Sequence, residues 1–241
     1  MNRITFYEHI RMRGPFGKTF SKTQVDGINL LLDAVNGRPI SHAAYLLATA
    51  WHETGGTMRP EREAFGKTDE DTINRLNRAW KAGKLGQVKA PYWRKDQSGR
   101  AWFGRGYVQL THIENYRRAS AVTGVDLVGD PSLAMRPDIA AKILVDGCEA
   151  GIFTGKKLSD YLPGDYVNAR RVVNGTDKAQ QIATYARAFE SALQAAGYSV
   201  AKKYARKPEP PLVTPSTPPL GIAAAIAAAL AALAVFFDKL F

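Results

Sequence analysis

Cysteine and histidine are scarce in this sequence of 241 residues. Cys148 is the only cysteine, so no disulfide bond can form within the chain. Its apolar surroundings predict a buried thiol, and no motif marks it as a nucleophile. The four histidines form neither an H-x-x-x-H nor an H-E-x-x-H pattern, which argues against a zinc site. We therefore expect no metal and no other cofactor.

Other common patterns are missing as well. Residues 1–8 contain no apolar h-region, so the sequence predicts no cleavable signal peptide. Strand and helix patterns do not alternate as in a βαβ protein, and no segment repeats. We expect a mainly helical globular body over residues 1–200, with at most a small strand element.

Positive charge dominates the composition. The formal net charge is +11 and the pI is about 9.8. This balance favours anionic partners, which include nucleic acid, acidic membrane surfaces and anionic cell-wall polymers, although solubility alone is an alternative explanation. No nucleic-acid recognition motif is present, so nucleic acid is not an expected partner.

Apolar residues at helical spacing predict several helices. The segment Ser21–Gln24 fits a capping box, and Ser41 is a candidate N-cap. The longest apolar run, residues 137–153, is expected to be the central core helix. The expected helices are the run from Ser21 to Gly37, the run from Ser41 to Thr54, and residues 69–82, 112–122, 137–153, 166–173 and 178–196.

The segment 84–103 is rich in aromatic and turn-forming residues. Its rings, among them Tyr92, Trp93, Trp102 and Phe103, either pack on the core or form a platform for sugar rings. Both interpretations remain open at this point.

The C-terminal part of the chain differs in composition from the body. Residues 201–219 form a basic and then proline-rich linker with six prolines, which predicts an extended, semi-rigid segment. Residues 220–237 carry no charge and, as a helix, would extend roughly 27 Å, just enough to cross a bilayer. Ala224, Ala228 and Ala232 lie on one face and favour close helix–helix self-association. We expect a transmembrane or membrane-active helix, with a buried soluble helix as the alternative.

Glu53 is the first candidate for chemistry. It follows the apolar helical run 46–51, and Gly55 and Gly56 then end the helix. An apolar environment raises the pKa of a glutamate and suits it to donate a proton near neutral pH. The sequence therefore predicts a general acid here.

Glu63 is the candidate for a second carboxylate, since glycoside hydrolysis uses two. It stands ten positions after Glu53, beyond a loop that can bring the two groups to opposite sides of a cleft. A surface ion pair with Arg59 or Arg62 explains Glu63 equally well. Glu61 competes with it for the same role.

Motifs along the chain resemble those of family 19 glycoside hydrolases, and the bacteriophage endolysin branch more than the plant chitinases. The resemblance covers roughly residues 40–195. Its motifs are His52-Glu53-Thr54-Gly55-Gly56, Gly104-Arg105-Gly106-Tyr107-Val108-Gln109-Leu110-Thr111 with Asn115-Tyr116, and Val173-Asn174-Gly175.

The resemblance implies a lysozyme-like helical fold with a cleft between two lobes, and an inverting mechanism. By motif, Glu53 matches the general acid, Glu63 the general base and Thr111 a residue that positions water. The candidate substrate-binding residues are His52, Arg105, Tyr107, Gln109, Asn115, Tyr116 and Asn174.

Structural roles remain open for four of these residues. Thr111 could N-cap the following helix, and Arg105 could pair with a carboxylate. His52 could hydrogen-bond in the core, and Asn174 could simply form a turn with Gly175.

We therefore expect a phage-type lytic enzyme that hydrolyses β-1,4 bonds of peptidoglycan. A chitinase acting on N-acetylglucosamine polymers, or a non-catalytic wall-binding protein that has kept the fold, are the alternatives. The expected location is the host cytoplasm and inner membrane, with action on the periplasmic cell wall.

Overall fold

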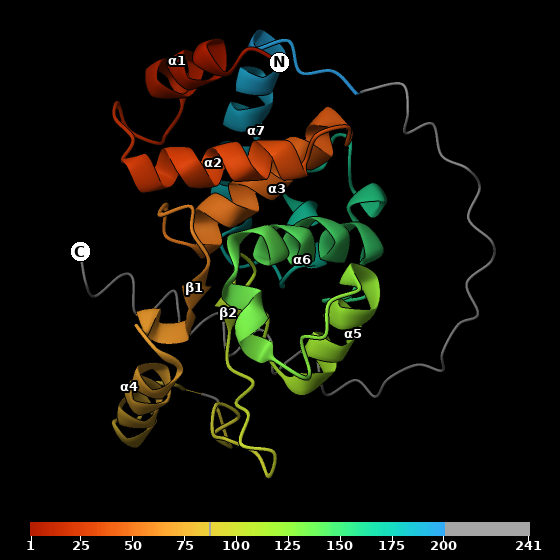
Figure 1. Ribbon diagram of the computed structural model, residues 1–241. Helices are drawn as coiled ribbons and strands as arrows, with labels where there is room; N and C mark the ends of the chain where they lie inside the picture. The colour runs from red at the N-terminus through yellow and green to blue at the C-terminus, as the bar shows by residue number, and fades with distance from the viewer. Residues whose placement is uncertain (87, 201–241) are drawn as a thin grey trace, which may run out of the picture.

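The computed structural model describes residues 1–86 and 88–200 (Figure 1). The expected linker 201–219 and the expected membrane-active helix 220–237 lie outside the described residues. Within the described part, no helix has the length and apolar character needed to cross a membrane.

Seven α-helices and one small sheet make up the described chain, so the expected mainly helical fold with a small strand element is confirmed. The α-helices are α1 (Arg3–Arg13), α2 (Lys22–Ala34), α3 (Ile40–Glu53), α4 (Asp69–Lys81), α5 (Ile113–Thr123), α6 (Pro137–Ala150) and α7 (Ala179–Ala195). The 3₁₀ helices are η1 (Glu63–Phe65), η2 (Pro131–Met135), η3 (Leu158–Asp160) and η4 (Asn168–Val172). The strands are β1 (Glu61–Arg62) and β2 (Arg105–Gly106).

Helix α3 lies at the centre of the larger core. It packs against α2, α6 and α7, and the side chains from Ala43 to Ala48 are fully buried. A helix that is apolar all round is typical of such a buried position. The prediction that residues 137–153 form the central helix was wrong, because α6 keeps one polar face exposed while α3 is enclosed on all sides.

Local signals fixed some helix ends and not others. The Ser21 hydroxyl accepts a hydrogen bond from Gln24 N and the Gln24 side chain accepts one from Ser21 N, so the predicted capping box is confirmed. Ser41 does not cap α3, because the helix begins one residue earlier, after Pro39. Gly124 ends α5 in the left-handed conformation that glycine adopts without strain.

The described chain has two separate hydrophobic cores. The larger one joins all the α-helices except α4. The smaller one lies between α4 and the aromatic segment after it, at the lower left and bottom of Figure 1. Trp93 and Phe103 are fully buried in it, so the core-packing interpretation holds for these rings.

The sheet stands between the two cores. Its two strands are antiparallel, with Glu61 opposite Gly106 and Arg62 opposite Arg105. A two-stranded ladder of this length is too short to be stable alone. Its importance lies in placing the segment after α3 beside the Gly104–Thr111 loop.

Candidate active site

Glu53 is the last residue of α3, and its carboxylate is almost completely buried. Gly55 and Gly56 follow with φ of 58° and 78°, values that favour glycine and turn the chain away from the helix axis. Arg170 of η4 donates from Nη1 to Glu53 Oε1 at 2.6 Å. The sequence predicted an apolar helical run behind Glu53, and the structure adds this buried guanidinium.

Arg170 is itself held in a fixed position. It is 1% exposed, and its Nε donates to the carbonyl oxygen of Asp177 at 3.2 Å. A guanidinium with fixed donors orients a carboxylate more narrowly than a lysine would. Glu53 therefore presents its second oxygen in a defined direction.

His52 precedes Glu53 and is partly buried. Burial lowers the pKa of its imidazole, while the nearby Glu53 carboxylate opposes that shift. The ring is therefore held largely in its neutral form near pH 7.

Glu63 lies beside the second motif. Its Oε2 accepts a hydrogen bond from Gly104 N at 2.7 Å and its Oε1 accepts one from the Tyr92 hydroxyl. The Glu63 N–H also donates to the Gly104 carbonyl at 2.8 Å. Burial raises the pKa of Glu63, and the bonds from Gly104 and Tyr92, with the charge of Arg105, act against that rise.

The surface ion-pair explanation of Glu63 was wrong. Arg59 pairs with Glu61 at 2.7 Å, and Arg62 pairs with Asp69 at 2.7 Å. Glu61 is buried too, with its Oε1 bonded to the Thr57 hydroxyl at 2.9 Å. The two competing carboxylates therefore differ: Glu61 has a cationic partner, whereas Glu63 has neutral donors.

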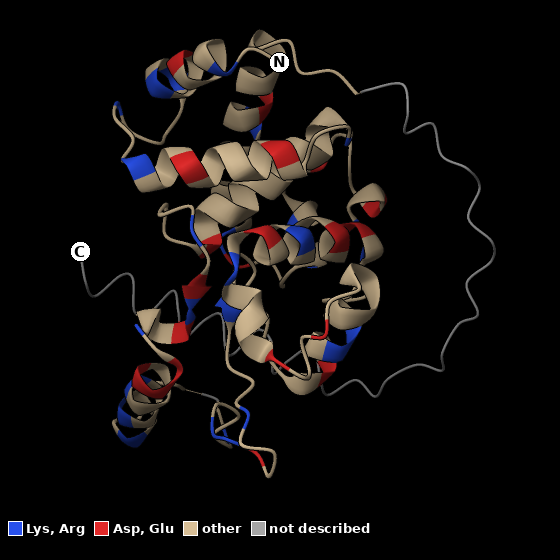
Figure 2. Cartoon of the chain, in the orientation of Figure 1, with Lys and Arg blue, Asp and Glu red and all other residues tan. Residues whose placement is uncertain are grey.

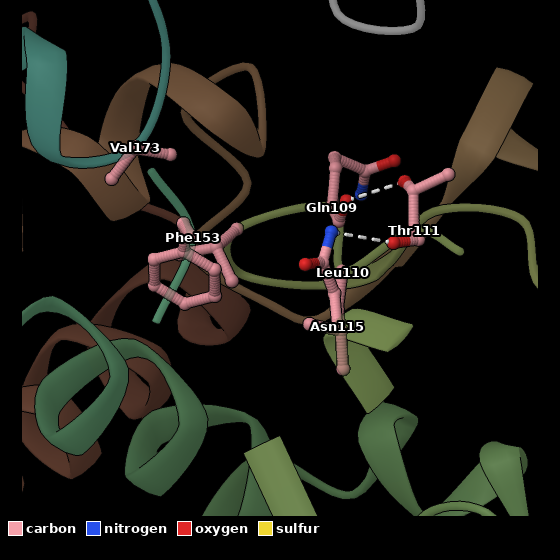
Figure 3. Close-up of a pocket in the computed structure, with 7 residues that line it drawn as sticks. Gln109, Leu110, Thr111, Asn115, Phe153 and Val173 are labelled. Carbon is pink, nitrogen blue, oxygen red and sulfur yellow. Dashed lines mark hydrogen bonds between the residues drawn. The ribbon is translucent and has the colours of Figure 1, made fainter. Parts of the chain in front are cut away.

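The loop from Gly104 to Thr111 carries the next candidates. Gln109 has φ of 51°, and its Nε2 donates to the Glu61 carbonyl at 3.0 Å. The Thr111 hydroxyl donates to the Gln109 carbonyl at 2.7 Å, and Asn115 Nδ2 donates to the Thr111 carbonyl at 2.8 Å (Figure 3). The N-cap of α5 is His112, without a side-chain hydrogen bond, so Thr111 is not the helix cap.

A pocket of about 20 Å³ opens beside these residues. It is lined by Val108, Gln109, Leu110, Thr111, Asn115, Phe153 and Val173 (Figure 3). This volume holds one or two water molecules but no sugar ring. Gln109 Oε1 is buried and has no hydrogen-bond partner among the described residues, so it is available to a donor from a ligand or a water.

Position 104 is closely packed. A Cβ there would lie 2.7 Å from Gln109 Oε1 and 3.2 Å from Thr111 Oγ1. The same residue bonds Glu63 through its backbone. Gly104 therefore brings the Glu63 carboxylate next to the side chains of Gln109 and Thr111.

Three of the candidate substrate-binding residues lie beneath this surface. The Arg105 side chain is fully buried and pairs with Asp69 at 2.7 Å. The Tyr116 hydroxyl accepts a hydrogen bond from Arg105 at 2.8 Å. The Tyr107 hydroxyl donates to the Met58 carbonyl at 3.2 Å. Arg105, Tyr107 and Tyr116 therefore support the loop and offer no exposed polar group to a ligand.

Asn174 lies at the edge of the candidate site. Its Oδ1 accepts a hydrogen bond from Gly175 N at 2.8 Å, the turn contact that the sequence also allowed. The preceding residue, Val173, lines the pocket. The Asn174 Nδ2 group remains a potential donor to a ligand.

Sequence reasoning missed Arg170 and Tyr92 as residues of the site. Arg170 stands beside Arg171 in an arginine pair, which gives no sign of which one is buried. Tyr92 was recognised only as one of several rings in an aromatic segment. Gly104 was part of the quoted motif, but its contacts with Glu63 could not be read from it.

Comparison with known proteins gives a consistent result over the first part of the body. Residues 33–144 match the family Chitinase class I of glycoside hydrolase family 19. Chitinase 11 of Oryza sativa subsp. japonica is 34% identical over 89 residues, which are 35% of this chain and 33% of that protein. The chain thus spans about a third of the length of this curated relative.

Solved structures of low sequence identity are also similar. Chitinase C from Streptomyces griseus HUT6037 has a TM-score of 0.47 and 19% identity, covering 82% of this chain and 76% of that chain. A bacterial family 19 chitinase has a TM-score of 0.42 and 19% identity, covering 81% and 94%. The matched region 33–144 contains Glu53, Glu63 and Thr111. The match to the family Chitinase class I therefore covers residues 33–144, just under half of the 241-residue chain.

Proposed function

We propose that the protein is an endolysin-type glycoside hydrolase that cleaves β-1,4 bonds of bacterial peptidoglycan with inversion. The observation that carries the proposal is the presence of two buried glutamates. Glu53 is held by a guanidinium at 2.6 Å, whereas Glu63 is held by neutral donors and its pKa is raised by burial. Two buried carboxyl groups suit the paired roles of this reaction; the assignment of Glu53 as acid and Glu63 as base comes from the family motifs and not from these environments.

In this mechanism Glu53 donates its proton to the glycosidic oxygen as the bond to the sugar carbon breaks. Glu63 removes a proton from a water molecule whose oxygen forms the new bond on the opposite face of the sugar. Inversion requires the two carboxyl groups to stand about 6.5–9.5 Å apart, with room for that water.

Thr111 supports the water in this scheme. Its hydroxyl proton is committed to the Gln109 carbonyl. The Thr111 oxygen therefore accepts a hydrogen bond from the water and orients it toward Glu63.

The test uses Glu53→Gln, Glu63→Gln and Glu61→Gln with purified sacculi, and the exposed Glu114→Gln as the control. We expect Glu53→Gln and Glu63→Gln to lose about 10²–10⁴-fold in rate, since each removes a proton-transfer group. Mass analysis of the products identifies the sugar at each new reducing end, and anomeric NMR tests inversion. Unchanged lysis by Glu53→Gln would indicate a different acid, and loss in Glu61→Gln alone would make Glu61 the base.

A chitinase is the second candidate, because residues 33–144 match the family Chitinase class I and the relative of 34% identity is named Chitinase 11. The same pair of carboxylates would cleave the neutral polymer. Turnover of chitin oligomers without turnover of sacculi would establish this alternative. Binding to sacculi without turnover of either substrate would indicate a non-catalytic wall-binding protein.

The location is a separate part of the proposal. We expect synthesis in the host cytoplasm, association with the inner membrane through residues 220–237, self-association of these segments, and action on the periplasmic wall. The support is the uncharged, alanine-rich sequence of 220–237 after a proline-rich linker. Deletion of residues 208–241 should move the protein from the membrane fraction to the soluble fraction, and unchanged fractionation would contradict the anchor.

A further inference from the structure

The segment 72–95 contains seven lysines and arginines and no acidic residue. Arg75 pairs with Asp71, and Lys95 pairs with Glu70. The other five are exposed and form no ion pair with a described residue; we call them the basic face: Arg78, Lys81, Lys84, Lys89 and Arg94.

The basic face draws on α4 and on the loop after it. Trp80 joins its two halves, because its Nε1 donates to the Val88 carbonyl at 3.2 Å and the Arg94 guanidinium lies 5.5 Å from its ring centre. Lys81 follows Trp80 at the end of α4, and Lys89 follows Val88. Figure 2 shows the blue C-terminal end of α4 and the blue residues of the loop after it.

Helix stability explains only part of this charge. Arg78 and Lys81 lie in the last turn of α4, where cations favour the helix dipole. Lys84, Lys89 and Arg94 lie beyond the helix and gain nothing from that dipole, whose effect is limited to the last turn. Like charges this close also repel one another, so their grouping costs stability unless an anion lies between them.

The same loop reaches the candidate active site. Tyr92 stands between Lys89 and Arg94, and its hydroxyl donates to the Glu63 carboxylate. The loop that carries Lys89 and Arg94 therefore also contacts the candidate base through Tyr92.

We propose that the basic face binds the carboxylates of the peptides attached to the glycan strands of peptidoglycan, and so favours cell wall over uncharged chitin. This inference rests on the proposed function for its substrate. Lysine and arginine side chains on a solvated surface suit mobile carboxylates, because they act as point charges without a fixed pocket. The attraction forms before the chemical step and persists through it, so it changes KM and leaves kcat largely unchanged.

The test compares two full-length variants. In the first, Arg78→Gln, Lys81→Gln, Lys84→Gln, Lys89→Gln and Arg94→Gln are combined. The matched control combines five exposed cations outside the segment, Arg11→Gln, Arg13→Gln, Lys18→Gln, Lys156→Gln and Arg187→Gln. Both carry the same charge change, and the control includes Arg11, which like Arg94 lies over an aromatic ring.

Three substrates separate the contributions: purified sacculi free of other wall polymers, the same sacculi with carboxyl groups converted to amides, and neutral chitin oligomers. We expect the basic-face variant to need about tenfold more sacculi for half-maximal rate, as five weak ion pairs together allow. Wild type should need about the same increase in substrate when the sacculi are amidated. On that substrate, wild type and the basic-face variant should have equal half-maximal concentrations. Rates on chitin oligomers should not change.

Equal behaviour of the basic-face variant and the control on sacculi overturns the proposal, as does an equal loss on neutral oligomers. If the basic-face variant loses binding to RNA or to anionic vesicles but still binds sacculi, the proposal is overturned in favour of those partners. Co-sedimentation with sacculi measures binding without turnover. An inactive wild type that still co-sediments through the basic face would refute the proposed function while sustaining this inference.

Discussion

Arg170 and Glu53 form a buried ion pair at 2.6 Å, although 117 positions separate them in the chain. The pair connects the end of α3 to η4. Arg170 lies outside the region 33–144 that matches the chitinase class I family. The surroundings of the candidate acid are therefore completed by the C-terminal half of the body.

Loss of Arg170 should leave Glu53 as a buried carboxylate without its cation. We expect Arg170→Gln to lower the free energy of unfolding by about 3–5 kcal/mol, the usual cost of removing one partner of a buried pair. Urea denaturation at pH 7 measures it. The neighbouring Arg171→Gln is the control, because the Arg171 side chain is exposed and donates to Asn168 and not to a buried carboxylate. Equal, small effects of the two substitutions would contradict a stabilising role for the pair.

Asp69 should stabilise the loop through Arg105, whose side chain it pairs with at 2.7 Å. Asp69→Asn leaves this buried guanidinium without a carboxylate. The expected loss is about 2 kcal/mol, less than for a fully buried pair because the Asp69 side chain keeps 38% of its exposure. Asp71→Asn should change stability less, because its partner Arg75 is 34% exposed and is not a buried guanidinium.

The pH dependence of the Asp69 contribution has a definite sign. Burial raises the pKa of Asp69, but the charges and hydrogen bonds of Arg105 and Arg62 outweigh this and lower it below 3.8. The advantage of wild type over Asp69→Asn should therefore be complete above pH 3.8. It should disappear as the pH falls through the lowered pKa.

Much of the fold could be predicted from local signals. The Ser21–Gln24 capping box depends only on neighbours in the chain, and it was correctly placed. Such local signals do not show which helix will be enclosed by the others. The sequence therefore predicted α6, and not α3, as the central helix. That choice depends on packing against α2 and α7 from other parts of the chain.

The candidate site shows the same limit. The motif around Gln109 and Thr111 marked candidate site residues, but it did not show that Arg105 points inward to Asp69. The partner of Glu53 could not be predicted either, since nothing in the spacing of Arg170 relates it to α3. Contacts across the chain follow from the tertiary fold, and single-sequence patterns do not contain them.

Glu63 should cost the protein stability at neutral pH. Burial raises its pKa above the ordinary value of 4.5, against the hydrogen bonds of Gly104 and Tyr92 and the charge of Arg105. As the pH rises past 4.5, the unfolded chain releases this proton first, so the folded state loses stability until its own pKa is passed. The thermal midpoint of Glu63→Gln should therefore rise relative to that of wild type as the pH increases from 4 to 8. The exposed Glu114→Gln should show no such trend, and a constant difference for Glu63→Gln would contradict the raised pKa.

Tyr92 should tune Glu63 during catalysis. Its hydroxyl donates to the Glu63 carboxylate and thereby lowers the pKa of that group. Tyr92→Phe removes this donor, so the pKa of Glu63 should rise further. If Glu63 is the base, the acidic limb of the kcat profile on sacculi moves to higher pH, because the base must be ionised to accept a proton.

Tyr198→Phe is the matched control for this experiment, since its hydroxyl donates to backbone carbonyls, those of Val35 and Arg38, and not to a carboxylate. A purely structural role for Tyr92 would lower the rate at every pH and leave the limb in place. An unmoved limb, together with inactivation by Glu61→Gln, would transfer the role of base to Glu61. The direction of the shift thus distinguishes the two carboxylates, because Glu61 has Arg59 as its partner and receives no hydrogen bond from Tyr92.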